Sequence, residues 1–333
     1  MATRAIRRPA IRAVLLALTV IVSAGYLVRA ATPGAWADTY AYWTYRLGPG
    51  AWTFPPNANL AGASVSHNYS PAFAQAIAPL QALSFPAFSF LWTAGAIALL
   101  ILLVGPRWAG LAALLLPPVD HELWNPNVAL ALAAVSVWGL RWPALWAAVF
   151  LTKITPGVGV AWFLVRREWR SLAIALSATA TILALSVAVD SSSWQAWVGW
   201  LRANNGAATP GYAFAVPLGV RLPLALALTA WAARTDRPWV LPMAVWIALP
   251  FIAWQSSVLF LAPAVRCLRR DDTNGAVARD AHRPGDGLAH HGPEALRGGR
   301  DRPHGIGGRE RRRPDQSMIE HHAACSTAKN WQT

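Results

Sequence analysis

The chain contains 333 residues, of which 55% are hydrophobic and only 13% are charged. Soluble domains carry about twice this proportion of charged residues, and disordered chains lack so much apolar surface, so both classes are excluded. The net charge of +14 would suit nucleic acid binding if the basic residues lay on one folded face. Instead, arginines flank apolar runs, as the positive-inside rule predicts. The composition therefore predicts an all-α polytopic membrane protein with no nucleic acid partner.

The N-terminal part of the chain predicts one membrane span followed by a long external loop. Residues 11–30 are apolar and about as long as a membrane-spanning helix needs to be. Arginines precede this run, so the N-terminus is expected in the cytoplasm. A cleaved signal peptide is the alternative, although the many later apolar runs favour an uncleaved helix. Residues 31–72 predict an aromatic-rich extracytoplasmic loop, and residues 72–83 an amphipathic segment on the membrane surface.

Apolar runs continue as far as residue 265 and predict several further crossings. Two regions, 142–165 and 239–265, have arginines at both ends and prolines inside, so each is expected to form a pair of short helices. The first pair should meet near Lys153–Pro156, and a second external loop is expected at 190–212. The total is about ten crossings, within two, with both termini cytoplasmic. The remaining predicted crossings are 86–105, 108–118, 126–140, 171–189 and 213–233.

The C-terminal region differs from the rest in composition. Residues 269–333 are polar and show no apolar periodicity, so they cannot bury enough surface to offset the entropy of ordering. We expect a disordered, solvated tail; contact of its basic stretches with anionic lipid or RNA is the alternative. The abrupt change also permits a reading-frame artefact. The predicted organisation is a membrane domain, residues 1–268, and a disordered tail.

Acidic residues are scarce in the membrane domain, and because charges near a bilayer are costly, each one is a functional candidate. Asp38 is the strongest, since it follows the first span inside an aromatic segment and can act as a general base on a sugar hydroxyl. A structural aspartate that caps a loop or a first helical turn is the alternative. The acidic residues of this domain are Asp38, Asp120, Glu122, Glu168, Asp190 and Asp236.

Two other groups of polar residues are candidates. Asp120-His121-Glu122 is predicted at an external turn, where it could bind a metal or transfer protons, or could simply be a polar loop. Lys153 is the only lysine before the tail and lies in an apolar stretch. It could hold a phosphate as a point charge, or extend to the membrane interface.

Some motifs are absent. The sequence has no G-x-x-x-x-G-K-[ST] loop, which disfavours nucleotide hydrolysis within this chain. No predicted cytoplasmic loop is long enough to house a domain that binds a nucleotide sugar. A sugar donor, if there is one, is therefore expected to arrive through the lipid phase.

Several short motifs occur between residues 38 and 170. They are Asp38-Thr39-Tyr40, Asn68-Tyr69-Ser70-Pro71, Glu122-Leu123-Trp124-Asn125-Pro126-Asn127, Leu151-Thr152-Lys153-Ile154-Thr155-Pro156 and Arg166-Arg167-Glu168-Trp169-Arg170. Their order resembles the superfamily C (GT-C) membrane glycosyltransferases, specifically glycosyltransferase family 87, which includes polyprenol-phosphate-mannose-dependent mannosyltransferases. The resemblance implies inverting transfer of a sugar, with mannose expected, from a polyprenyl-phosphate donor. The acceptor would be a lipid-linked or cell-envelope glycan on the extracytoplasmic face.

On this resemblance, Asp38 is the catalytic base. Lys153 is the candidate for the donor phosphate, and Asn125 and Asn127 are candidates for the sugar hydroxyls. No cofactor or metal ligand is expected, and a need for a divalent metal stays open. A multi-spanning transporter or lipid flippase is the alternative function, and a non-enzymatic assembly partner of envelope enzymes is a third. The full set of expected substrate-binding residues is Tyr40, Arg46, Tyr69, Glu122, Asn125, Asn127 and Lys153.

Overall fold

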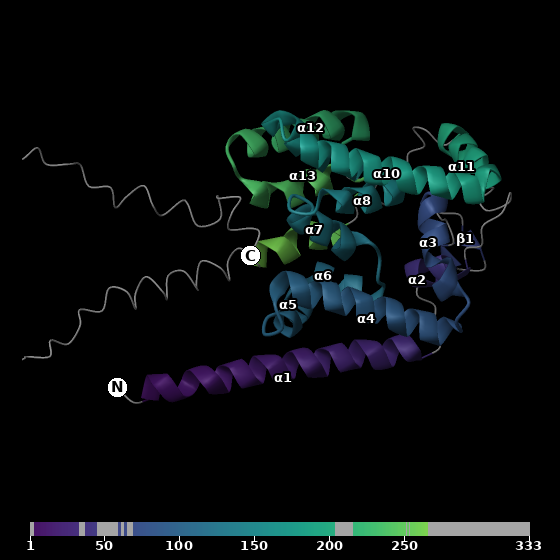
Figure 1. Ribbon diagram of the computed structural model, residues 1–333. Coiled ribbons are helices and arrows are strands. Elements are labelled where there is room, and N and C mark those ends of the chain that lie inside the picture. The colour runs from purple at the N-terminus through teal and green to yellow at the C-terminus, as the bar shows by residue number, and fades with distance from the viewer. Residues whose placement is uncertain are drawn as a thin grey trace, which may run out of the picture.

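A computed structural model gives the fold, and helices make up nearly all of the chain that it describes (Figure 1). The predicted tail, residues 269–333, lies outside the described residues. Two strands of two residues each, β1 (Asn59–Leu60) and β2 (Ala63–Ser64), pair antiparallel. The described residues are 3–32, 37–44, 59–60, 63–64, 69–203, 216–250, 252 and 254–265.

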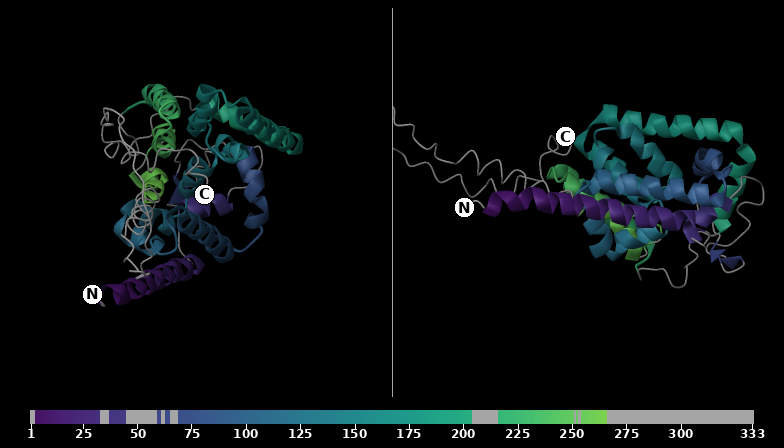
Figure 2. Two further views of the ribbon diagram at one scale, coloured as in Figure 1. Left: turned by 60° about the vertical axis from the view of Figure 1, so that its left-hand side comes forward. Right: turned by 90° about the horizontal axis from the view of Figure 1, so that it is seen from below.

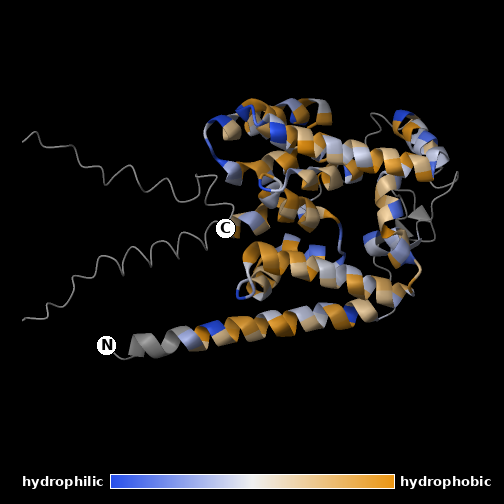
Figure 3. Cartoon of the chain, viewed as in Figure 1, coloured by the Kyte–Doolittle hydropathy of each residue, from blue (hydrophilic) through white to orange (hydrophobic). Residues whose placement is uncertain are grey.

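Three helices are long and apolar enough to cross a membrane: α1 (Thr3–Ala31), α4 (Phe85–Val104) and α10 (Trp169–Val189). Membrane crossings were predicted at 11–30, 86–105 and 171–189, and the structure confirms a long apolar helix at each of these positions. Figure 1 shows α1 and α10 running in one direction and α4 in the other. Apolar residues predominate along all three (Figure 3). The count of about ten crossings stays a prediction.

The surface of these helices suits a lipid environment. Figure 2 shows α1 at the edge of the bundle, where it packs against α4 and α5. Val20, Ile21 and Val28 of α1 are each about two-thirds exposed, and Val189 at the end of α10 is 77% exposed. A soluble protein rarely leaves so large an apolar surface in water. The described helices therefore support the prediction of a membrane protein.

Shorter helices complete the bundle, and α2, α3 and α11 gather at the end where α1 and α10 finish (Figure 1). Two predictions were wrong in detail, because helices occupy parts of the expected loops 31–72 and 190–212. The shorter helices are α2 (Ala37–Thr44), α3 (Pro71–Gln81), α5 (Ala109–Leu115), α6 (Pro117–Trp124), α7 (Ala129–Trp138), α8 (Trp146–Thr152), α9 (Ala161–Arg166), α11 (Ser191–Ala203), α12 (Leu218–Arg234) and α13 (Leu241–Ile247), with 3-10 turns η1 (Pro143–Leu145), η2 (Thr155–Val160), η3 (Pro238–Val240) and η4 (Trp254–Ser257).

The region 142–165 folds back on itself, as the basic residues at both its ends predicted. Helix α8 ends at Thr152, and the chain resumes helical structure in η2. The ring of Trp146 packs on Gly159 and that of Phe150 on Gly157, with no room for a side chain at either glycine. Pairing of these positions in reverse order makes the two halves antiparallel. The prediction of two short helices is confirmed, and Lys153 lies at their turn.

The region 239–265 also contains two helical segments, α13 and a second from Trp254 to Val265. Between them the chain leaves the helix at Ala248 and leaves backbone carbonyls without helical partners. The guanidinium of Arg221, on α12, accounts for several of them. It donates to the carbonyls of Ile247 and Leu249 at 2.8 Å and of Pro250 at 3.2 Å. A buried cation thus stabilises this break.

We predict that Arg221→Met lowers the free energy of unfolding by about 3 kcal/mol or more. In the wild type the buried carbonyls accept hydrogen bonds from a charged group, and the variant leaves them without this donor. Thermal unfolding in detergent measures this effect. Arg234→Met is the matched control, since Arg234 is exposed in the last turn of the same helix. It should change stability by less than about 0.5 kcal/mol. Equal losses in both variants would contradict the role given to Arg221.

Candidate active site

The carboxylate of Asp38 is held by two asparagine amides. Asp38 lies in the first turn of α2 and is partly exposed. Its Oδ2 accepts hydrogen bonds from the Nδ2 atoms of Asn125 at 3.1 Å and Asn127 at 2.9 Å. The Asp38 backbone N–H donates to Oδ1 of Asn125 at 3.1 Å, so the side-chain amide of Asn125 both donates a hydrogen bond to Asp38 and accepts one from it. Within the described residues, Oδ1 of Asp38 receives no donor.

The two asparagines belong to a non-helical turn between α6 and α7. Pro126 disfavours helical backbone at Asn125, which has φ −133° and ψ 73°. Outside a helix the two asparagines can turn to the same side, and both of their Nδ2 atoms donate to Asp38. The Pro126 carbonyl accepts from Nε1 of Trp92 at 3.1 Å and Oγ1 of Thr39 at 3.4 Å. The turn is thereby fixed to both α4 and α2.

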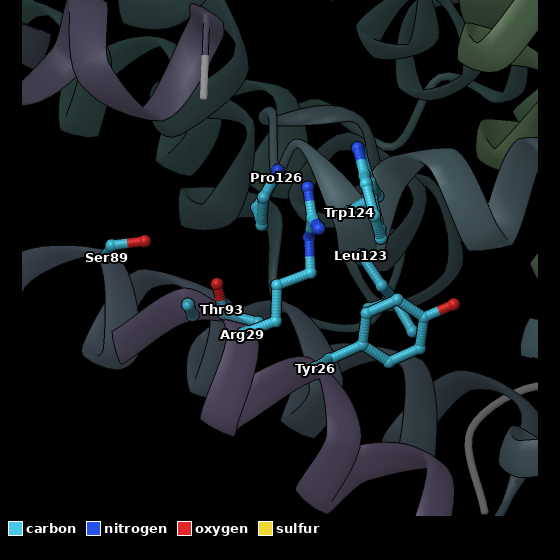
Figure 4. Close-up of a pocket in the computed structure, with 8 residues that line it drawn as sticks. Tyr26, Arg29, Ser89, Thr93, Leu123, Trp124 and Pro126 are labelled. Atoms are coloured by element: carbon cyan, nitrogen blue, oxygen red, sulfur yellow. The ribbon is translucent and has the colours of Figure 1, made fainter. Parts of the chain in front are cut away.

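The opposite side of this turn lines a small crevice between α1, α4 and α6 (Figure 4). The guanidinium of Arg29 lies over the ring of Trp124, and Tyr26 donates a hydrogen bond to Asp120. These contacts join the last turns of α1 to α6. The crevice is lined by Tyr26, Arg29, Ala30, Ser89, Thr93, Leu123, Trp124 and Pro126. The first membrane helix therefore supports the turn from behind.

Asn125 and Asn127, whose amides hold Asp38, form what we call the amide clamp, and Tyr69 supports it at Asn127. Its hydroxyl donates to Oδ1 of Asn127 at 3.0 Å and lies 2.7 Å from the hydroxyl of Tyr42. The backbone N–H of Val128 also donates to Oδ1 of Asn127, at 2.6 Å. Both tyrosines are buried, and their rings meet edge to face at 5.4 Å. Tyr69 was predicted to bind substrate, and the structure places its hydroxyl within the protein.

Glu122 is buried beneath the site and is 1% exposed. Its carboxyl accepts from the backbone N–H groups of Leu130, at 3.3 Å, and Asn127, so it caps the first turn of α7. Burial, the largest effect, raises the pKa of the Glu122 carboxyl to about 8, and the nearby charge of Asp38 adds to this rise. Glu122 thus holds the residues that follow the turn.

The sequence Asp120-His121-Glu122 was predicted at an external turn, and this was wrong because all three residues lie on helix α6. Their side chains have different neighbours. Asp120 accepts from Tyr26, the ring of His121 meets Trp254 edge to face at 5.3 Å, and Glu122 is buried. Across the described ranges, no three His, Cys, Asp or Glu side chains gather as a metal site would need.

Lys153 reaches the same place from the turn of the α8 hairpin. Its Nζ lies 5.4 Å from the centre of the Tyr69 ring, and the charges of Asp38 and Glu122 both act on it. Ser70, the N-cap of α3, donates to the carbonyl of Leu151 and so ties this turn to α3. A cation, a carboxylate and two amides therefore share one site, although they come from three distant segments.

One predicted site residue, Tyr40, stands apart from this cluster. The ring of Tyr40 packs against Phe85 at 5.3 Å and Trp43 at 5.8 Å, on α2 but outside the clamp. Arg46 lies outside the described residues. Sequence analysis missed Tyr42, which is four residues after Asp38. A helical reading of residues 37–44 would have placed these two side chains on one face.

We predict that protonation of Glu122 makes stability depend on pH. A carboxyl whose pKa is near 8 in the folded chain and near 4.5 when unfolded binds its proton more tightly in the folded state. Stability should therefore fall as pH rises from about 4.5 to 8, and Glu122→Gln should reduce this fall. The thermal unfolding midpoint of both proteins across this pH range tests the prediction. Identical pH dependence in the two proteins would contradict it.

Comparison with known protein families identifies a relationship. A family model described as glycosyltransferase family 87 matches residues 67–280, well over half of the chain. No curated protein and no solved structure matches. The matched segment contains Asn125, Asn127 and Lys153, and Asp38 precedes it.

Proposed function

We propose a specific reaction for this chain, which belongs to glycosyltransferase family 87 and is a membrane glycosyltransferase. It transfers a sugar, with mannose expected, from a polyprenyl-phosphate donor. The acceptor is a lipid-linked or cell-envelope glycan, and the product has inverted configuration. Family membership favours this activity over the transporter or flippase. The site lies on the extracytoplasmic face of a multi-pass protein with cytoplasmic termini. The gathering of α2 and α3 where α1 and α10 end supports this placement (Figure 1).

The clamped carboxylate of Asp38 is the observation that carries the proposal. Hydrogen bonds to Oδ2 orient the group, and no donor among the described residues binds Oδ1. In the proposed reaction, Oδ1 takes the proton of the acceptor hydroxyl. The hydroxyl oxygen then bonds to the anomeric carbon as the bond from that carbon to the phosphate oxygen breaks. The polyprenyl phosphate leaves with the bonding electrons, and Asp38 keeps the proton until solvent removes it.

Lys153 is proposed to receive the phosphate. An ammonium group stabilises the charge that develops on the leaving phosphate more strongly in a water-poor site than in water. The position of Lys153 at the Tyr69 ring, within the field of Asp38, supports its acting beside the base. Its place in the turn of a folded-back hairpin also fixes its backbone. Asn125 and Asn127 act on the base in this scheme, so their amides hold Asp38 rather than the sugar.

We predict that Asp38→Asn lowers kcat by about 100-fold or more, since the amide cannot accept the acceptor's proton. The assay supplies purified protein with polyprenyl-phosphate sugar and a lipid-linked acceptor. Asp190→Asn is the matched control, because Asp190 accepts hydrogen bonds from Ser192 and Ser193 at the start of α11, away from the clamp. It should stay within twofold of wild type. Transfer by Asp38→Asn at the wild-type rate would rule out the base.

We further predict that Lys153→Met raises KM for the donor by about tenfold or more while KM for the acceptor changes little, since a charged contact to phosphate is lost. Initial rates over a matrix of both substrates separate the two constants. The control is Arg202→Met, an exposed cation in the last turn of α11. An unchanged donor KM in Lys153→Met would contradict the phosphate role.

A further inference from the structure

The orientation of the Asn127 amide decides whether it attracts or repels Asp38. An amide can be turned to present either its N–H₂ group or its oxygen to a neighbour. In the first case it donates to the carboxylate, and in the second it places a second acceptor against it. Two donors hold the Asn127 oxygen away from Asp38: the Tyr69 hydroxyl at 3.0 Å and the Val128 backbone N–H at 2.6 Å.

The hydroxyl of Tyr69 is itself oriented. A hydroxyl has one hydrogen to donate, so when Tyr69 donates to Asn127, the proton between the two tyrosines must come from Tyr42. The hydrogen bonds then run in one direction, from Tyr42 to Tyr69, to Asn127, and to Oδ2 of Asp38. Burial of both tyrosines excludes the water that would otherwise replace a member of this series.

The series also closes on itself. Tyr42 and Asp38 are four residues apart on α2 and so lie on the same face of that helix. The path that leaves α2 at Tyr42 passes through Tyr69 and Asn127 and returns to α2 at Asp38. Further contacts hold the tyrosines in place. The rings of Tyr69 and Phe73 pack at a tilt with their centres 4.8 Å apart, and Gln81 donates to the Tyr42 carbonyl at 2.6 Å.

We propose that Tyr69 is a positioning residue: by fixing the orientation of the Asn127 amide, it determines that this amide donates to Oδ2 of Asp38 and so orients the carboxylate. The effect of this positioning on catalysis rests on the proposed function, in which Asp38 is the base. The positioning itself follows from the contacts. Tyr42 acts one step further back. The substrate-binding role predicted for Tyr69 is replaced by one exerted through Asn127.

The direct test is infrared spectroscopy of the full-length protein, labelled with ¹³C-aspartate, in lipid nanodiscs. The band lost in Asp38→Asn identifies the Asp38 carboxylate. Tyr69→Phe should shift this band, and Tyr42→Phe should shift it less. Thr229→Val is the control, since it removes a buried hydroxyl that donates to the Ala225 carbonyl within α12. It should leave the band in place.

Asn127→Leu provides the second variant if Tyr69→Phe does not fold, and it should shift the band at least as far. In transfer assays Tyr69→Phe should lower kcat by about tenfold and leave both KM values within twofold. An unshifted band in Tyr69→Phe would overturn the inference even if Asp38 is essential. A shifted band together with transfer that does not need Asp38 would instead overturn the proposed function and leave the positioning intact.

Discussion

The non-helical turn Asn125-Pro126-Asn127, between α6 and α7, is the constraint on which the site depends. In a helix, successive side chains are about 100° apart around the axis, so the two asparagines would point to nearly opposite sides. They could not then share one carboxylate oxygen. Pro126 disfavours that helix, and in the non-helical turn both amides donate to Asp38. Carboxylates accept such hydrogen bonds more strongly than neutral groups do, so the clamp fixes the direction of the other oxygen.

Each neighbouring element holds this turn at a different point. Glu122 caps α7 just after it, and the first membrane helix supports it from behind through Arg29 and Trp124. Trp92 of α4 holds the central carbonyl. The folded-back hairpin of α8 and η2 brings in Lys153, the one cation beside Asp38 in the described part of the site. A short turn is thus made rigid by groups from most of the bundle.

Sequence patterns predicted the apolar helices well, because length and hydropathy are local properties. They also predicted the folded-back hairpin, since arginines at both ends of 142–165 report topology. Asp38, Asn125, Asn127 and Lys153 were selected in advance, and the structure brings them together. The pattern did not show which of the predicted site residues have their polar groups bonded within the protein, as Tyr69 and Glu122 do. That distinction depends on contacts between residues that are 58 positions apart for Tyr69 and 8 positions apart for Glu122. The spacing of residues within one helix or strand does not predict such contacts. The helix at residues 37–44 was missed because its aromatic residues show no clear amphipathic period.

The central claim is that Asp38 and its amide clamp work as one unit, and a double-mutant cycle tests it most directly. Single-turnover rates with radiolabelled donor would be measured for wild type, Asp38→Asn, Asn127→Leu and the double variant. The account predicts that Asn127→Leu slows transfer in the wild-type background and has no further effect once Asp38 is replaced. Equal losses from Asn127→Leu in both backgrounds would show that Asn127 acts independently of Asp38, which would contradict the account.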